Sequence, residues 1–266
     1  MVTTRSGEST ETPTKPTTRS TTRATASPQP PTPTRTRANA ESPAAPTTSK
    51  KARNAAWAHT PSNLTLIWLA ISLPLVLWDA GYVLLRPHSM PGGKWHSPIW
   101  KPYALYADID YVYGFPALQD NNPWTATQTW FNVFETTGYL VYLYWVYTHG
   151  QQEAVQGRGA PDKSVMGQLR ALSESRTLTG TVAAHAVLLA FSIASLTFFK
   201  TVMYWLLEYL SGWHNIGHNS FGTLVVYWIL PNGAWLVGPS YMMYVFGQEI
   251  LQGLEVAAGG SSRKTK

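Results

Sequence analysis

Residues 64–85 read LTLIWLAISLPLVLWDAGYVLL, and this run decides the fold class. At 1.5 Å rise per residue a helix of this length crosses the ~30 Å hydrocarbon core of a bilayer. Comparable apolar runs occupy residues 127–148, 182–210 and 221–247. The chain is therefore predicted to be an all-α membrane protein with four transmembrane helices in a bundle.

Each of the four runs contains a polar or ionisable residue: Asp79, Glu135, Lys200 and Asn232. A charged group in hydrocarbon costs at least a few kcal/mol, so it is retained where it faces a protein interior and usually where it has a function. Counted from the loop side opposite the N-terminus, the four lie at depths of about 9 to 16 Å. We expect them to meet at one level of the bundle.

Two carboxyl groups close together do not both ionise readily, so Asp79 and Glu135 can divide the roles of proton donor and proton acceptor. Trp235 and Tyr204 lie one turn from members of the set, and an indole face stabilises a cation. The competing interpretation is structural: Lys200 forms a salt bridge with Asp79 or Glu135 that only holds the helices together.

The three parts of the chain are distinguished by composition. Residues 1–58 are rich in Ser, Thr, Pro and Arg and are predicted to be disordered. Their prolines argue against a transit peptide, which needs an amphipathic helix. Residues 59–250 form the predicted transmembrane domain, and residues 251–266 a polar C-terminal tail. The absence of cysteine excludes disulfides and cysteine-ligated metals.

Basic residues predict the orientation of the domain. Residues 1–63 hold nine of the 20 Lys and Arg but three of the 14 Asp and Glu, a formal +6 that equals the whole net charge. Further basic residues lie between the second and third runs and at the C-terminus. The positive-inside rule then places both termini in the cytosol. The tail's charge is spread too thinly to predict a nucleic-acid-binding face.

A set of residues between 64 and 247 resembles, in order and spacing, the emopamil-binding protein family with its EXPERA domain. The set comprises Trp100-Lys101-Pro102-Tyr103, Asp108, Tyr111, Phe131, Glu135-Thr136, Tyr204-Trp205-Leu206-Leu207-Glu208, Gly212, Ile216-Gly217-His218, Asn232, Trp235-Leu236-Val237 and Pro239.

The resemblance implies a multi-pass protein of the endoplasmic reticulum that acts in sterol or lipid metabolism. The family's sterol Δ8–Δ7 isomerase implies a catalytic role for Glu135, with Asn232 as orienter and Trp235 against a carbocation. Asp79 stands where the family has a glutamate. Leu75 stands where the isomerase has a histidine of its proton relay, and Lys200 matches no family position. These departures favour acid/base isomerisation or cyclisation of a sterol, terpenoid or other lipophilic metabolite.

The alternative function is a non-catalytic sterol or lipid binder of the sigma-2 receptor type. Five residues are assigned to substrate binding: Lys200, Tyr204, Tyr111, Thr136 and Glu208. No cofactor motif is present, and no metal is expected because His214 and His218 lack a third ligand. The expected partners are a lipophilic small molecule or sterol and the bilayer, with homo-oligomerisation possible.

Overall fold

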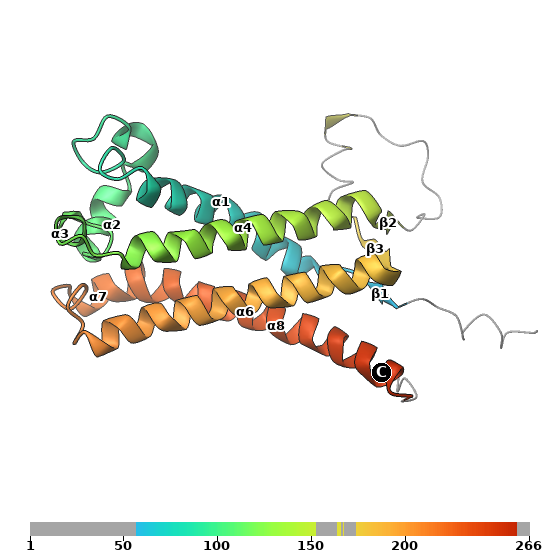
Figure 1. Cartoon of the computed structure of the whole chain (residues 1–266). Helices are drawn as coiled ribbons and strands as arrows, with labels where there is room; N and C mark the ends of the chain where they lie inside the picture. Colours follow the sequence, from blue (N-terminus) through green and yellow to red (C-terminus); the bar gives the residue numbers. More distant parts are fainter. Residues whose placement is uncertain (1–56, 153–163, 166, 168–173, 260–266) are drawn as a thin grey trace, which may run out of the picture. The chain divides into compact units, whose positions relative to one another are not determined.

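The computed structural model describes residues 57–152, 164–165, 167 and 174–259. These residues belong to one compact unit, Ser49–Lys266. The predicted disordered tail therefore lies outside the described residues, apart from its last two positions. Most of the described structure is helical (Figure 1).

Four long helical segments run through the unit (Figure 1). They are α1 (Asn63–Leu84), α4 (Trp124–His149), α6 (Gly180–Leu210), and a continuous segment made of α7 (Phe221–Leu224), the π-helical turn η2 (Val225–Ile229) and α8 (Leu230–Ala257). Among the described residues, three helices are long and apolar enough to cross a membrane: Asn63–Leu84, Gly180–Leu210 and Phe221–Ala257. By their length and composition they indicate a helical membrane protein.

Helix α4 forms over the second predicted run, but it is not among these three apolar helices. Its polar side chains explain this, because Asn132, Glu135 and Thr136 lower its average apolarity while facing the protein interior. Its outward face exposes large apolar side chains such as Trp130 and Phe134. A fourth membrane span remains a prediction. It is favoured by the arrangement of α4, whose polar side chains face the protein interior and whose large apolar side chains face outward.

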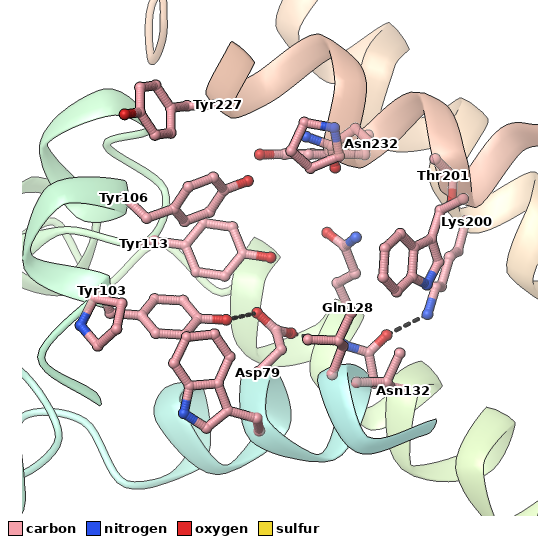
Figure 2. Close-up of a pocket in the computed structure, with 17 residues that line it drawn as sticks. Asp79, Tyr103, Tyr106, Tyr113, Gln128, Asn132, Lys200, Thr201, Tyr227 and Asn232 are labelled. Carbon is pink, nitrogen blue, oxygen red and sulfur yellow. Dashed lines mark hydrogen bonds between the residues drawn. The ribbon is translucent and has the colours of Figure 1, made fainter. Parts of the chain in front are cut away.

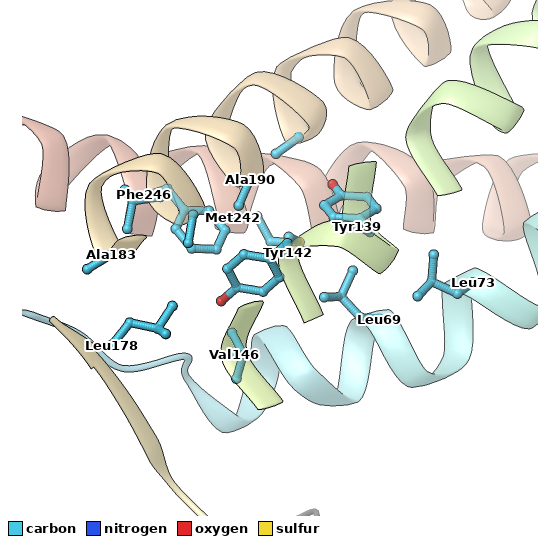
Figure 3. Packing of buried hydrophobic residues seen from close by; sticks show 13 residues of the cluster. Leu69, Leu73, Tyr139, Tyr142, Val146, Leu178, Ala183, Ala190, Met242 and Phe246 are labelled. Carbon is cyan, nitrogen blue, oxygen red and sulfur yellow. The ribbon is translucent and has the colours of Figure 1, made fainter. Parts of the chain in front are cut away.

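The long helices pack in sequence, with α4 in contact with α1 and α6, and α6 in contact with α8. One buried cluster joins them, in which Tyr142 of α4 lies among Leu69, Val146 and Met242 (Figure 3). The buried face of α6 is mostly alanine over several turns, with Ala183, Ala186, Ala190 and Ala194 beside a single larger residue, Val187. Small residues let neighbouring helices approach closely, which explains the tight packing around α6.

The segment between α1 and α4 is not an extended loop. It folds into a π-helical turn η1 (His96–Trp100) and the short helices α2 (Tyr103–Ile109) and α3 (Phe115–Gln119). Its aromatic rings hold it to α1: Tyr103 stacks on Tyr82 at 3.9 Å, and the Tyr82 hydroxyl donates to the carbonyl of Tyr113 at 3.0 Å. The segment therefore covers one end of α1.

A small sheet accompanies the helices. The chain is not purely helical, because β1 (Ala58–His59), β2 (Gln151–Gln152) and β3 (Arg176–Thr179) form an antiparallel sheet in the order β1-β3-β2. Backbone groups beyond the helix ends find partners in this way. Helix α8 continues to Ala257, so the first residues of the predicted C-terminal tail are helical, with Leu251 and Leu254 at helical spacing.

The contact between α8 and α1 depends on Gly238. A Cβ atom at this position would lie 2.5 Å from the Trp68 ring, closer than side chains tolerate. We expect Gly238→Ala to lower the free energy of unfolding by about 1–3 kcal/mol, because the rigid indole must move. Gly233→Ala is the matched control in the same helix, since a Cβ atom added there would have no neighbouring atom within 4 Å. Equal stability of the two variants in detergent unfolding would contradict this account of the interface.

Candidate functional site

A cavity of about 330 Å³ lies between α1, α4, α6, the α7–η2–α8 segment and the covering segment with α2. Aromatic rings make up much of its wall, among them Trp78 and Trp235. Tyr106 and Tyr227 also line it (Figure 2). Apolar and aromatic walls with a few placed polar groups are typical of sites for small lipophilic molecules.

Asp79 supplies the carboxyl group of the cavity wall. Its Oδ1 accepts a hydrogen bond from the Tyr103 hydroxyl at 2.6 Å, and its Oδ2 accepts one from Asn132 Nδ2 at 2.9 Å (Figure 2). Neither partner is basic. Asp79 is therefore hydrogen-bonded on both oxygens without a direct ion pair among the described residues.

Lys200 lies beside Asp79 but is joined to it through Asn132. The Lys200 ammonium donates to Asn132 Oδ1 and to Glu135 Oε2, with which it forms a buried salt bridge. The result is one continuous chain of contacts from Tyr103 through Asp79, Asn132 and Lys200 to Glu135. Residues of α2, α1, α4 and α6 thus meet in a single polar network inside an apolar unit.

Three tyrosines of the covering segment direct their hydroxyls toward the cavity: Tyr103, Tyr106 and Tyr113 (Figure 2). Burial raises the pKa of each phenol well above its ordinary value of 10.0, and nearby carboxyl and phenol groups raise it further. All three are neutral hydrogen-bond donors at physiological pH.

Asn232 and Trp235 face the cavity from α8. The Asn232 amide donates to the carbonyl of Trp228 at 2.8 Å, which fixes its orientation one turn back along the helix. The Trp235 ring packs edge-on against Trp68 at 5.4 Å. Both positions suit contact with a bound molecule.

No protein-family model, curated protein or solved structure matches this chain.

The geometry separates the residues predicted from the sequence into two groups. Asp79, Lys200, Tyr204, Asn232 and Trp235 line the cavity. The other four predicted residues lie outside its lining: Glu135, Thr136, Tyr111 and Glu208.

The second group has other partners. Glu135 lies behind Lys200, and Thr136 is buried next to it on α4. Tyr111 stacks on His218 at 4.1 Å, and Glu208 accepts a hydrogen bond from Asn215 at 2.6 Å. The contacts of Tyr111 and Glu208 join residues outside the cavity lining, whereas Glu135 contacts the cavity wall through Lys200.

The sequence pattern did not predict Asn132 or the tyrosines that face Asp79. Asn132 lies in the second apolar run, one turn before Glu135. The free-energy cost of a polar residue in hydrocarbon therefore marks Asn132 as a candidate in the same way as it marks Glu135. Tyr103 belongs to the motif that resembles the family, but the motif gives it no role. Tyr106 and Tyr113 gave no signal, because a tyrosine in a loop is ordinary. Among the described residues, no group of three His, Asp or Glu side chains suits a metal ion.

A second buried cluster fixes the covering segment to the helices beside the cavity. Asp110, which follows α2, accepts hydrogen bonds from the Tyr204 hydroxyl and from Trp228 Nε1, the latter at 3.0 Å. Burial and the nearby carboxyl of Glu208 raise the pKa of Asp110 to about 7. Tyr204 thus connects this anchor to the cavity wall.

This anchor predicts a dependence of stability on pH. Between the ordinary pKa of 3.8 and the folded value of about 7, folded Asp110 holds a proton that the unfolded chain has lost. The stabilisation is complete below the lower value and is lost as pH rises through about 7. Relative to Asp110→Asn, the wild type should lose on the order of a few kcal/mol of unfolding free energy between pH 4 and pH 8.

The measurement is urea or thermal unfolding in detergent across this pH range. Asp108→Asn is the matched control, because Asp108 is exposed two residues away. A wild type and an Asp110→Asn variant with parallel pH profiles would contradict the assignment of Asp110.

Proposed function

We propose that the protein is a membrane isomerase or cyclase that moves a proton on a sterol, terpenoid or other lipophilic metabolite. The observation that carries the proposal is the position of Asp79, a carboxyl group without a direct counter-ion in the wall of an aromatic cavity. Ordinary packing does not favour such a group in an apolar setting, and buried carboxyl groups in clefts are frequent acid/base catalysts.

Asp79 is the proton-transferring group in this proposal. Trp235 offers a ring face and Asn232 an amide beside the cavity, as the resemblance to the emopamil-binding family leads one to expect. Glu135 acts through Lys200 as its counter-ion rather than by touching the substrate. The membrane in question is that of the endoplasmic reticulum, with four spans and both termini cytosolic.

The departures from the family favour a reaction other than sterol Δ8–Δ7 isomerisation. Leu75, in place of the family's histidine, presents an apolar side chain to the cavity. Lys200 introduces a cation that the family pattern lacks. A changed proton relay argues for a changed substrate.

The second candidate, a non-catalytic lipid binder, is favoured by the Glu135–Lys200 pair. That pair neutralises the carboxyl group which the resemblance makes catalytic. A binder needs the cavity but no proton relay.

The experiment is expression in yeast that lacks its own sterol Δ8–Δ7 isomerase, with growth in heavy water and mass analysis of the lipid fraction. An isomerase or cyclase produces a new deuterium-bearing lipophile that is missing with Asp79→Asn at equal expression. A Δ7 sterol as that product identifies sterol isomerisation. If wild type and Asp79→Asn give the same lipid profile in yeast, the gene is then deleted in its own host. An unchanged lipid profile there as well would rule out the enzyme and favour the non-catalytic lipid binder.

A further inference from the structure

The orientation of the Asn132 amide follows from its two neighbours. The Lys200 ammonium has only donors to offer, so the atom of Asn132 that faces it is the acceptor Oδ1. The amide NH2 group must then face Asp79, where Nδ2 lies 2.9 Å from Oδ2. Lys200 thereby sets the direction of the whole chain of hydrogen bonds, which runs from Lys200 through Asn132 to Asp79.

This direction makes Asp79 the acceptor end of the network. Its Oδ2 accepts from Asn132 and its Oδ1 from the Tyr103 hydroxyl at 2.6 Å. Hydrogen bonds donated to both oxygens favour the ionised form of a carboxyl group. In its ionised form Asp79 can take up a proton from a molecule in the cavity.

Lys200 is the donor end of the same network. Its ammonium has three N–H groups, and its two acceptors among the described residues, Asn132 and Glu135, account for two of them. Lys200 also lines the cavity, so the third N–H is available to a bound molecule. A donor N–H at this place in the wall favours binding of an oxygen that gains negative charge.

A donor and a base separated by one amide group match a particular substrate class. We infer that the cavity binds a lipophilic β,γ-unsaturated ketone, with the carbonyl oxygen on Lys200 and the adjacent CH2 group on Asp79. An aspartate base with a donor on the oxygen suits proton removal next to a carbonyl. The inference rests on the proposed function and names the substrate for it.

The reaction balances without an oxidant or a cofactor. Asp79 removes a proton from the carbon between the carbonyl and the double bond, and the electron pair of that C–H bond moves onto the carbonyl oxygen as a dienolate. The Lys200 N–H stabilises this oxyanion. The proton held by Asp79 is then delivered to the far carbon of the former double bond while the carbonyl re-forms. The product is the conjugated α,β-unsaturated ketone.

The test uses full-length protein in lipid nanodiscs with a polycyclic β,γ-unsaturated ketone as the probe. Ultraviolet absorbance follows formation of the conjugated product, and a Δ8 sterol without a ketone is assayed in parallel. We expect conversion of the ketone above the rate of empty nanodiscs. The charge-balanced variant Lys200→Met/Glu135→Gln should lose on the order of 10²–10³ in kcat, as expected for the loss of an oxyanion donor.

The outcomes separate the two proposals. Conversion of the sterol but not of the ketone would overturn the ketone inference and leave the isomerase. Conversion of neither probe would also overturn it, and the lipid profile in yeast would still decide the broader function. Ketone conversion that is unchanged in the double variant, at matched thermal stability, would remove Lys200 from the reaction.

Discussion

The Asp79→Asn variant is expected to lose 10²–10⁴-fold in the rate of proton transfer, the range that a positioned acid or base supplies. Asparagine keeps the shape of the side chain but cannot accept the proton. The cavity and its binding of lipophiles should persist, so the loss should fall on kcat rather than on KM. The measurement is the initial rate of product formation at matched protein amount.

The control for this substitution is Asp120→Asn, the same change at an exposed carboxyl group beside α3. It should leave the rate unaltered. Comparable rates for wild type and Asp79→Asn would mean that Asp79 is not the proton carrier, and the proposed chemistry would then lose its central residue.

Replacing Lys200 by Met is expected to lower the free energy of unfolding by about 3–5 kcal/mol. The variant leaves the Glu135 carboxylate buried without its counter-ion, and the cost of that isolated charge dominates. Adding Glu135→Gln should restore much of the lost stability, because the remaining pair is neutral. Thermal or denaturant unfolding in detergent measures both steps.

Lys101→Met serves as the matched control, since Lys101 is exposed. It should change stability by little. Two results would contradict this account: a Lys200→Met variant as stable as the wild type, or no gain in unfolding free energy when Glu135→Gln is added. Either would mean that the Lys200–Glu135 pair does not affect the stability of the folded protein.

The long helices could be predicted because apolar runs of this length have few alternatives to a helix. The similar depth of Asp79 and Lys200 along their helices could also be predicted from the helical rise per residue. The exact partners could not. Helical periodicity gives the face on which a side chain lies, but packing decides which neighbour it meets. Glu135 thus turns to Lys200 and away from the cavity, and Asn132 takes the place beside Asp79.

The segment between α1 and α4, which covers one end of α1, is the part of the fold that the sequence predicts least. Short helices such as α2 and α3 carry no strong periodic signal, and tertiary contacts hold them in place. Tyr103 is the clearest case: its stacking on Tyr82 brings its hydroxyl to Asp79. No local pattern in the sequence specifies that contact. Asp79 could be identified from the sequence because a carboxyl group in an apolar run is energetically costly. Its hydrogen-bond partners could be identified only from the folded structure.

The most direct test of the central claim is the protonation state of Asp79 in the resting protein. It can be read from the infrared difference spectrum between wild type and Asp79→Asn in lipid at neutral pH. The account predicts that the wild type shows a carboxylate signal that the variant lacks, with no change in the carbonyl stretch of protonated acids. A protonated-acid band that is present in the wild type and lost in Asp79→Asn would contradict it.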